Sequence, residues 1–365
     1  MPVTKNTAAS ASLLNKMAVK DDKTRRDIRD LSLAELKSYL VSIDEKPFRA
    51  RQIFDWIYKK GAAGFGQLAN VPESLKNQLS HDFVFEPITI ATELKSADGT
   101  RKFLFDLKDK EQVETVLIPT AGRTTACISI QVGCKFGCRF CASGIAGWKR
   151  NLSPAEILAQ VLHVRKESSN GRVLSHIVFM GIGEPLDNYD NLIRAVDLIN
   201  GKEALGLGAR KITVSTSGVV PKIKMLAAQD VQLELAISLH GYDNASRDVL
   251  MPVNKKYPIE ELMAACREYA AAKKRVITFE YIMIKGVTVT PSAPAALKKL
   301  FSGIKCKMNL IPYNKVDEFP HECPSLKEMT GFREALEKLG IHATIRTPRG
   351  RDVGAACGQL RHAHH

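Results

Sequence analysis

The chain has 365 residues, of which 45% are hydrophobic and 25% charged, and this length and composition fit an ordinary globular protein of two or more domains. No apolar run is long enough to span a membrane. Residues 1–27 lack the apolar core of a secretory signal, so we expect a flexible tail, with a transit peptide as the weaker alternative. The net charge of +14 favours a polyanionic partner, most often a nucleic acid.

Helical signals follow the tail. Ser32 and Glu35 have the spacing of a capping box, in which each side chain bonds the backbone N–H of the other residue. Pro47 suits the first position of a second helix, and Pro72 precedes a third. Residues 28–86 are therefore predicted to form a small helical domain with a basic surface, and the alternative is a packing appendage.

From residue 87 onward the hydrophobic pattern changes to the alternation that is typical of strands. We predict strands over residues 87–94, 101–107 and 113–118. Turn residues such as Asp98-Gly99 separate them, which favours an antiparallel meander. Residues 87–122 are therefore predicted to form an antiparallel β extension.

One carboxylate lies on the apolar face of this extension. Glu114 shares a face with Val116 and Ile118, because alternate residues of a strand point the same way. Burial of a carboxylate among apolar residues is costly unless the group is paired or has a function. The structural alternatives for Glu114 are a place at an exposed edge and a pair with an arginine.

Strands and helices then alternate to the end of the chain. Strands are predicted over residues 125–131, 174–180, 210–216, 232–238, 276–284 and 306–311. A capping box at Ser153 and Glu156, with Pro154 at the first helical position, begins the first intervening helix. Six consecutive β/α units predict a parallel sheet curved into a partial barrel over residues 123–347, and a doubly wound open sheet is the alternative.

The loop after the first of these strands carries three closely spaced cysteines, Cys134, Cys138 and Cys141. Three thiolates can hold three corners of a [4Fe–4S] cluster, which normally takes four cysteine ligands. No fourth cysteine is close in sequence, so one iron would stay open for chemistry. The alternative is a zinc knuckle on Cys138 and Cys141, but it lacks a second Cys/His pair nearby.

Polar and glycine-rich motifs follow the other strands of the predicted barrel. They are Gly181-Ile-Gly183-Glu184-Pro185, Ser215-Thr-Ser217-Gly218, Ser238-Leu239-His240 and Asn309-Leu-Ile-Pro-Tyr313-Asn314. Active sites of β/α barrels form where the strands end, so the shared position of these motifs predicts a ligand site. Taken singly, Gly181-x-Gly183 fits a tight turn and His240 fits a core histidine.

The eight cysteines suit a reducing compartment, and two outside the loop stand apart. Cys127 is predicted to share a side with Ser129 and Gln131, toward the barrel mouth. Cys357 lies among small residues in the C-terminal segment, residues 348–365. Each of the two, taken singly, fits an inert free thiol. The same interpretation applies to Cys266, Cys306 and Cys323.

The whole motif set resembles one family, the radical S-adenosylmethionine (SAM) adenosine methyltransferases of ribosomal RNA, known as the RlmN/Cfr group. The motifs are the three-cysteine loop with Gln131-Val-Gly before it, Arg150-Asn151-Leu152, the strand-end motifs above, Met251-Pro-Val-Asn254 and Ala355-Ala-Cys357-Gly358-Gln359-Leu360. Ile182 stands where the family usually has methionine. The resemblance implies a radical SAM partial (β/α)6 barrel and an N-terminal helical domain that helps to hold RNA.

Site residues follow from the resemblance, position by position. It implies that Cys134, Cys138 and Cys141 bind the cluster. The residues implied for the SAM site are Gly183, Glu184, Ser215, Ser238, Leu239, His240 and Asn314. It also implies that Cys357 carries a methyl group, that Cys127 resolves the adduct through a transient disulfide, and that Glu114 accepts a proton.

The resemblance further implies the reaction and its partners. The expected activity is methylation of C2 of an adenosine in the peptidyl-transferase centre of 23S rRNA, and of a tRNA adenosine next to the anticodon. Two SAM molecules per turnover, an electron donor such as flavodoxin, a monomer and a cytoplasmic location are expected with it. One alternative is the same chemistry at adenine C8, as in the antibiotic-resistance branch. Another, of a different class, is a non-catalytic Fe–S protein that binds RNA.

Overall fold

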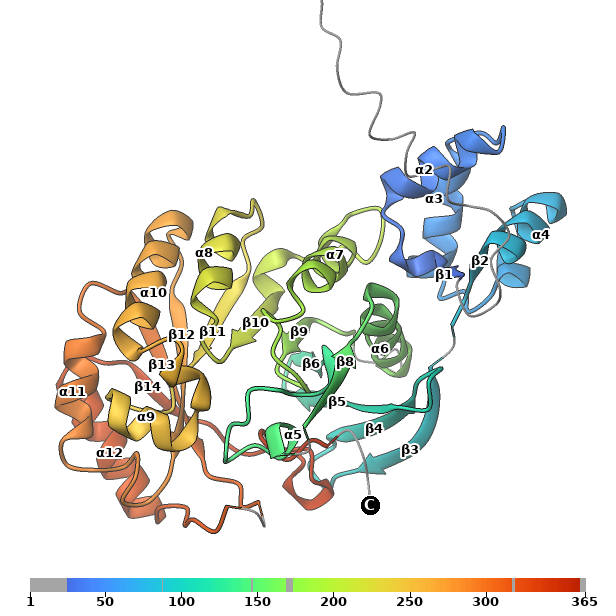
Figure 1. Ribbon diagram of the computed structural model, residues 1–365. Coiled ribbons are helices and arrows are strands. Elements are labelled where there is room, and N and C mark those ends of the chain that lie inside the picture. Colours follow the sequence, from blue (N-terminus) through green and yellow to red (C-terminus); the bar gives the residue numbers. More distant parts are fainter. Residues whose placement is uncertain (1–24, 87, 146, 169–172, 317–318, 362–365) are drawn as a thin grey trace, which may run out of the picture. The chain divides into compact units, whose positions relative to one another are not determined.

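The computed structural model in Figure 1 describes residues 25–86, 88–145, 147–168, 173–316 and 319–361. The chain forms two compact units, Met1–Glu86 and Pro87–His365. Most of the expected tail, residues 1–24, and the end of the C-terminal segment, residues 362–365, lie outside the described residues. Among the residues that are described, no helix is long and apolar enough to cross a membrane.

The first unit is mainly helical. Its elements are β1 (Arg26–Asp27), η1 (Ile28–Asp30), α2 (Leu33–Ser42), α3 (Arg49–Phe54), the π-helical η2 (Asp55–Lys59), η3 (Phe65–Gln67), α4 (Glu73–Asp82) and β2 (Phe83–Val84). The capping box of Ser32 and Glu35 is confirmed. The strands β1 and β2 pair in parallel, so Arg26–Asp27, which we expected in the tail, belong to this unit.

The helix expected from Pro47 begins later, at Arg49. The N–H groups of Arg49 and Ala50 bond the carbonyls of Lys46 and Pro47, three residues earlier, at 3.0 and 3.2 Å. This tighter spacing forms a turn before the α-helix proper.

The second unit is built on a ten-stranded sheet with the order β14-β13-β12-β11-β10-β9-β6-β5-β4-β3. Its strands are β3 (Thr89–Lys95), β4 (Arg101–Asp106), β5 (Gln112–Thr120), β6 (Arg123–Cys127), β9 (His176–Phe179), β10 (Ile212–Thr216), β11 (Glu234–Ser238), β12 (Ile277–Met283), β13 (Cys306–Pro312) and β14 (Ala343–Ile345). From β6 to β14 every pair is parallel, whereas β3 to β6 form an antiparallel meander. The predicted β extension is therefore continuous with the barrel sheet.

The strand order confirms the partial barrel and excludes the doubly wound alternative. Each parallel strand lies beside the next one in the chain, with no reversal of direction across the sheet, whereas a doubly wound sheet requires such a reversal. The sheet is not closed, because β14 and β3 form its two edges. The seventh parallel strand, β14, was not predicted from the sequence, since it has only three residues.

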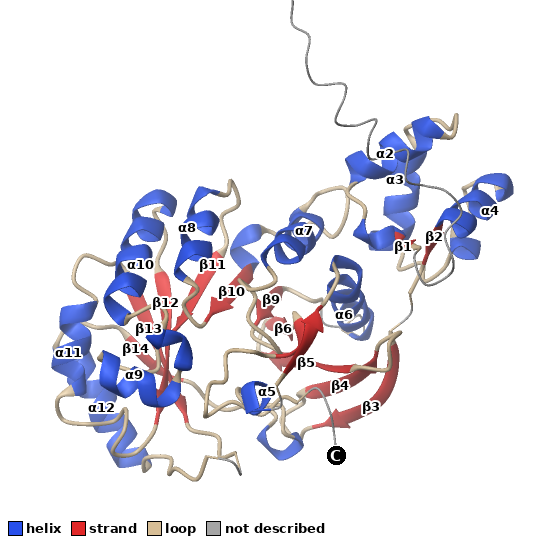
Figure 2. Ribbon diagram, in the orientation of Figure 1, coloured by secondary structure: helices blue, strands red, loops and turns tan. Residues whose placement is uncertain are grey.

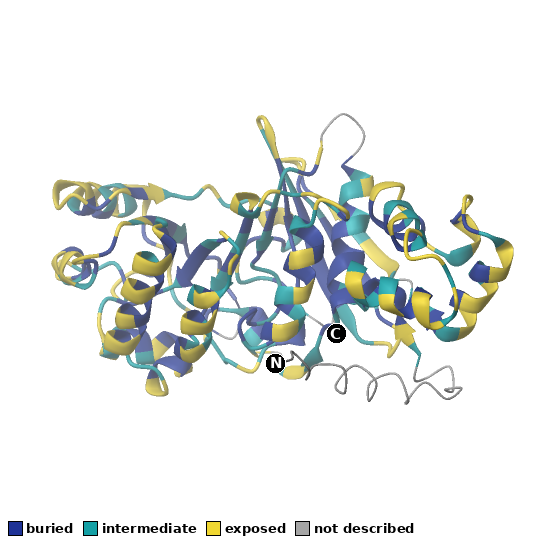
Figure 3. Cartoon of the chain, turned by 90° about the horizontal axis from the view of Figure 1, so that it is seen from above, coloured by how far each residue is buried: buried dark blue, intermediate teal, exposed yellow. Residues whose placement is uncertain are grey.

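Helices cover the outer side of the curved parallel strands (Figure 2). They are α6 (Pro154–Glu167), α7 (Tyr189–Asn200), α8 (Val220–Ala228), α10 (Ile259–Lys273), α11 (Ala293–Leu300) and α12 (Leu326–Lys338). The shorter helices α5 (Ala142–Ile145) and α9 (Asn244–Leu250) lie in the loops after β7 and β11, and the 3-10 turns are η4 (Ala209–Lys211), η5 (Pro252–Lys255) and η6 (Arg351–Val353). The capping box at Ser153 and Glu156 is confirmed. Figure 3 shows the buried strands between helices whose outer faces are exposed.

One strand prediction needs correction. The segment 125–131 is not one strand: β6 ends at Cys127, and β7 (Gln131–Gly133) pairs instead with β8 (Trp148–Asn151) in a separate two-stranded sheet. Gln160 on α6 accounts for the break. It accepts the N–H of Ser129 at 3.0 Å and donates to its carbonyl at 3.1 Å, so a side chain satisfies the backbone where the ladder stops.

Gln160 also accepts a hydrogen bond from the Thr115 hydroxyl at 2.7 Å, and it is completely buried. We expect Gln160→Leu to lower the free energy of unfolding by about 1–3 kcal/mol, because it leaves both backbone groups of Ser129 buried without their partner. Urea unfolding followed by circular dichroism measures the change. The control, Thr115→Val, removes a single side-chain bond and is expected to cost less. Equal stability of Gln160→Leu and the wild type would contradict this account.

Candidate active site

The three-cysteine loop is held at its base by two glycines. Gly133 at the end of β7 has φ of 71°, and a Cβ there would lie 1.9 Å from the carbonyl oxygen of Gly147. The N–H of Cys134 donates to that same oxygen at 2.7 Å. Because only glycine fits this approach, the hairpin of β7 and β8 closes tightly under the loop.

The three thiols of the loop are free and partly buried. Burial raises the pKa of the Cys134 thiol to about 12 and that of Cys138 well above its ordinary value, and nearby thiols of the same set add to both shifts. Three neighbouring soft thiols fit an iron–sulfur cluster, which would bind them as thiolates. No three Cys, His, Asp or Glu side chains in the described part of the chain are already arranged around a metal position.

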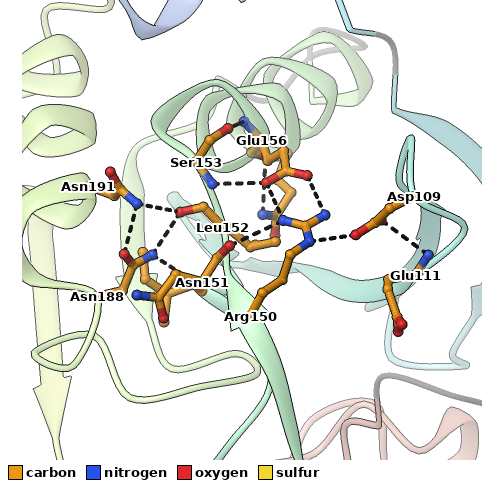
Figure 4. Close-up of polar contacts among 11 residues, drawn as sticks. Asp109, Glu111, Arg150, Asn151, Leu152, Ser153, Glu156, Asn188 and Asn191 are labelled. Carbon is orange, nitrogen blue, oxygen red and sulfur yellow. Dashed lines mark hydrogen bonds and ion pairs between the residues drawn. The ribbon is translucent and has the colours of Figure 1, made fainter. Parts of the chain in front are cut away.

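Arg150 on β8 fixes the hairpin that carries the loop (Figure 4). Its guanidinium donates to Asp109 in the β4–β5 turn at 2.6 Å and to both oxygens of Glu156 at 2.9 and 2.8 Å. Asn188, before α7, donates to the carbonyl of Leu152 at 2.8 Å. The Arg150-Asn151-Leu152 motif therefore anchors the loop to its surroundings.

The loop after β9 brings Gly183 and Glu184 against the same hairpin. Gly183 has φ of 104°, and a Cβ there would lie 2.6 Å from that of Gln131. The buried Glu184 carboxylate accepts the N–H groups of Leu186 at 3.0 Å and Ser217 at 2.7 Å. Burial raises its pKa, and these N–H donors act against that rise. The Glu184 side chain thus ties the ends of β9 and β10 together.

His240 follows β11 in the left-handed conformation, with φ of 50°. Its Nδ1 accepts the N–H of Ile282 at 3.0 Å, and burial lowers its pKa to about 3. The ring is therefore neutral and carries its proton on Nε2. Its edge packs on Phe140 of the cysteine loop, with ring centroids 4.8 Å apart. Ser215 and Ser238, half-buried, lie at the ends of the adjacent strands β10 and β11.

The C-terminal segment lies beside the cysteine loop, as the red chain near α5 in Figure 1 shows. The N–H of Ala142 donates to the carbonyl of Gly358 at 2.8 Å, and the Ser143 hydroxyl donates to that of Leu360 at 2.6 Å. Asn314 donates to the carbonyl of Cys357 at 3.1 Å, and its oxygen accepts from Arg351. The exposed Cys357 thiol is thus positioned by its backbone.

Cys127, at the end of β6, packs against this same segment. It shares one apolar cluster with Ala355 and Leu360, and both Cys127 and Cys357 are free thiols. Burial raises the pKa of Cys127 to about 12, and the nearby Cys357 adds to that rise. We had expected the Cys127 side chain to point the same way as those of Ser129 and Gln131. Because β6 ends at Cys127, strand alternation does not relate these three side chains.

Glu114 is not at an exposed edge, and one of its partners is a lysine. It is completely buried, and its Oε1 lies 2.8 Å from Nζ of Lys102 on β4. Its Oε2 accepts the N–H of Arg361 at 2.9 Å, which attaches it to the far end of the C-terminal segment.

The structure therefore brings the cysteine loop, Cys127, Glu114 and Asn314 to one C-terminal segment. It also adds residues that the sequence analysis missed. Lys102 is the clearest, and its signal was a charge on a strand whose other residues are mostly apolar. Gln131 was named in the sequence motif without a role, and its side chain accepts the N–H of Glu184 at 2.9 Å and donates to Asp187 at 2.8 Å.

Comparison with known proteins gives matches over nearly all of the chain. The Radical SAM superfamily matches residues 128–291, and the ribosomal RNA large subunit methyltransferase N-terminal domain matches residues 26–84. A probable dual-specificity RNA methyltransferase RlmN of Clostridium novyi is 44% identical over 337 residues, which is 92% of this chain and 98% of the relative. The dual-specificity RNA methyltransferase RlmN of Syntrophus aciditrophicus is 44% identical, over 92% of this chain and 96% of its own length.

A solved structure agrees with these matches. The crystal structure of a radical SAM methyltransferase from Sphaerobacter thermophilus superimposes with a TM-score of 0.90 and 42% sequence identity. The superposition covers 93% of this chain and 100% of the other.

The buried pair of Lys102 and Glu114 gives a stability prediction. Lys102→Met is expected to lower the free energy of unfolding by about 3–5 kcal/mol, because it removes a cation that lies 2.8 Å from a buried carboxylate. The double variant Lys102→Met/Glu114→Leu is expected to recover most of this loss, since it removes both charges. Urea unfolding midpoints of the two variants and the wild type measure the difference, and equal midpoints for the single and double variants would argue against a buried pair.

Proposed function

The chain belongs to the RlmN family of radical SAM RNA methyltransferases, and on this basis we propose that it transfers a methyl group to C2 of adenosine in RNA. The proposed targets are an adenosine of the peptidyl-transferase centre in 23S rRNA and an adenosine next to the tRNA anticodon. The observation that carries the proposal is the C-terminal segment, which places Cys357 beside both the cysteine loop and the cluster of apolar residues around Cys127.

Cys134, Cys138 and Cys141 would hold a [4Fe–4S] cluster, and the strand-end residues would hold SAM. The bound cluster supplies the electron that releases a 5′-deoxyadenosyl radical from SAM. The half-buried hydroxyls of Ser215 and Ser238 and the neutral His240 are proposed to orient SAM. Asn314 is proposed to contact SAM as well, and its bond to Cys357 supports a site where SAM and the methyl carrier are adjacent.

Cys357 is the proposed methyl carrier. Its thiolate takes the methyl group of a first SAM by ordinary displacement, and a second SAM provides the radical that removes a hydrogen from this S-methyl group. A carbon-centred radical is needed because adenine C2 is not a nucleophile. The side chain of Cys357 is exposed and its backbone is held by hydrogen bonds, which supports its role as carrier.

Cys127 is the proposed resolving thiol. After the carbon of the S-methyl group has joined adenine, the adduct would have to lose its unpaired electron, for which a bound cluster would be the acceptor. Attack of the Cys127 thiolate on the sulfur of Cys357 would then form a disulfide, break the carbon–sulfur bond and release the methylated base as the freed carbon takes up a proton. Its packing against Ala355 and Leu360 supports this role. Glu114 is the proposed acceptor of the proton that leaves the adenine ring, and its bond to Arg361 supports a place beside the same segment.

The RNA partner follows from charge and access. A net charge of +14 favours a polyanion, and the N-terminal unit is proposed to help hold it. The target adenine must leave its stack to reach the cysteine loop, so single-stranded or unstacked RNA is the expected substrate. We propose a monomer that acts in the cytoplasm and takes its electrons from a donor such as flavodoxin.

The first experiment identifies the product. The holoenzyme is reconstituted without oxygen and supplied with SAM, a reductant and unmodified 23S rRNA or tRNA, and the digested RNA is examined by mass spectrometry. We expect 2-methyladenosine from both RNAs. An 8-methyladenosine product would assign the chain to the alternative C8 chemistry. The absence of SAM cleavage by a cluster-loaded enzyme would favour a non-catalytic RNA-binding protein.

The second experiment separates the two thiols. Cys127→Ala is expected to accumulate a covalent RNA–protein adduct on denaturing gels, because the step that releases the product is removed. Cys357→Ala is expected to form no adduct and no methyladenosine. Cys323→Ala, which alters an exposed thiol without a proposed role, serves as the matched control and is expected to behave like the wild type. Adduct formation by Cys357→Ala would refute the carrier assignment.

A further inference from the structure

An arginine without a carboxylate partner is buried beside the cysteine loop. Arg247 on α9 is completely buried. Its hydrogen bonds go to the carbonyls of Ser238 at 3.0 Å, Leu239 at 2.7 Å and Ser217 at 2.5 Å, to Oδ1 of Asn254 at 3.0 Å and to the sulfur of Met251 at 3.0 Å. Among the described residues, every acceptor that it bonds is therefore neutral.

Two glycines make room for this side chain. A Cβ at Gly241 would lie 2.8 Å from that of Arg247, and a Cβ at Gly218, where φ is 110°, would lie 3.0 Å from Nη2. Gly218 follows β10 and Gly241 follows β11, so the guanidinium occupies the space between two strand ends that carry proposed SAM contacts. Gly218 therefore leaves room for the guanidinium, and Gly241 leaves room for α9 at the backbone of residue 247.

A buried cation is costly unless an anion compensates for it. The nearest acid in sequence, Asp248, bonds Asn254 at 2.7 Å and not the guanidinium. Burial lowers the pKa of Arg247 to about 10, and the largest opposing influence is the charge of the Cys138 thiolate. The hydrogen bonds described for the guanidinium thus supply dipoles and no anion.

The residues at the end of α9, next to Arg247, contact the cysteine loop. The N–H of Arg139 donates to the carbonyl of Leu250, at the end of α9, at 3.0 Å. Cys138 and Cys141 pack against an apolar cluster that contains Leu250 and Met251, and the Met251 sulfur is the atom that Arg247 contacts. The guanidinium therefore contacts the same apolar cluster as the two cysteines.

We propose that Arg247 is the internal counter-cation of the iron–sulfur cluster and that it stabilises the reduced, more negative state of that cluster. This inference rests on the proposed function, since it requires a cluster on Cys134, Cys138 and Cys141. A positive charge shielded from water acts strongly on a neighbouring anion, and reduction adds one more negative charge. Arg139 lies on the loop itself but is exposed, so solvent screens its charge.

The test is the reduction potential of the cluster in the anaerobically reconstituted enzyme, without SAM or RNA. Reduced cluster is measured by electron paramagnetic resonance across a redox titration, and iron and sulfide contents are measured in parallel. In Arg247→Gln the ratio of reduced to oxidised cluster at a fixed potential is expected to fall about tenfold, a shift of about 59 mV for a one-electron couple. In Arg247→Lys, which keeps the charge, the ratio is expected to stay within about twofold of the wild type.

Arg139→Gln is the matched control, because it removes an exposed charge from the loop, and its ratio is also expected to stay within about twofold. If Arg247→Gln fails to fold, Arg247→Lys still decides, since a tenfold fall in a variant that retains the cation would overturn the proposal. A wild-type reduction potential in a fully cluster-loaded Arg247→Gln enzyme would also overturn the proposal for Arg247. The proposed function would still stand if the wild type made methyladenosine. A wild type that binds no cluster would overturn both the proposal for Arg247 and the proposed function.

Discussion

The seating of the C-terminal segment on the loop-bearing end of the barrel is the interaction on which the rest of the site depends. Ala142 and Ser143 on α5 bond the carbonyls of Gly358 and Leu360, although more than 200 residues separate the partners. These bonds, with that of Asn314 to the carbonyl of Cys357, fix the position of Cys357 relative to the cysteine loop. The carboxylate of Glu114 fastens the same segment at Arg361. Helix α5 and strand β5 thus both hold this short stretch of chain.

Parallel topology makes this convergence possible. Because β6 to β13 follow one another side by side, the loops that leave their carboxyl ends all open at one rim. The buried side chains at this rim bond mostly backbone groups: Glu184 holds two N–H groups and Arg247 holds three carbonyls. The strand ends are therefore rigid, while the hydroxyls and the Nε2 proton of His240 remain available to a ligand.

Local patterns predicted the parts of this architecture that depend on near neighbours in sequence. Capping boxes at Ser32 and Ser153 and the β/α alternation were recognisable because their signals lie within a few residues. The end of the strand at Cys127 was not recognisable, because it depends on the bond of Ser129 to Gln160, 31 residues away. The partner of Glu114 was also unforeseen, because the register of β4 and β5 decides which strand residues meet. The family resemblance supplied the site residues, and the structure shows which of them are neighbours.

The way in which the segment around Cys357 is attached has a kinetic consequence. Its bonds to α5 and Asn314 use only its own carbonyls, and each such bond contributes about 0.5–1.5 kcal/mol. Gly354 and Gly358, with φ of 60° and 84°, lie on either side of Cys357 in the left-handed conformation that favours glycine. Loss of any one of these bonds therefore costs little, whereas release of the whole segment would also break the bond of Arg361 to Glu114 and expose Ala355 and Leu360. Opening of the whole segment is therefore expected to be much slower than opening of a single bond.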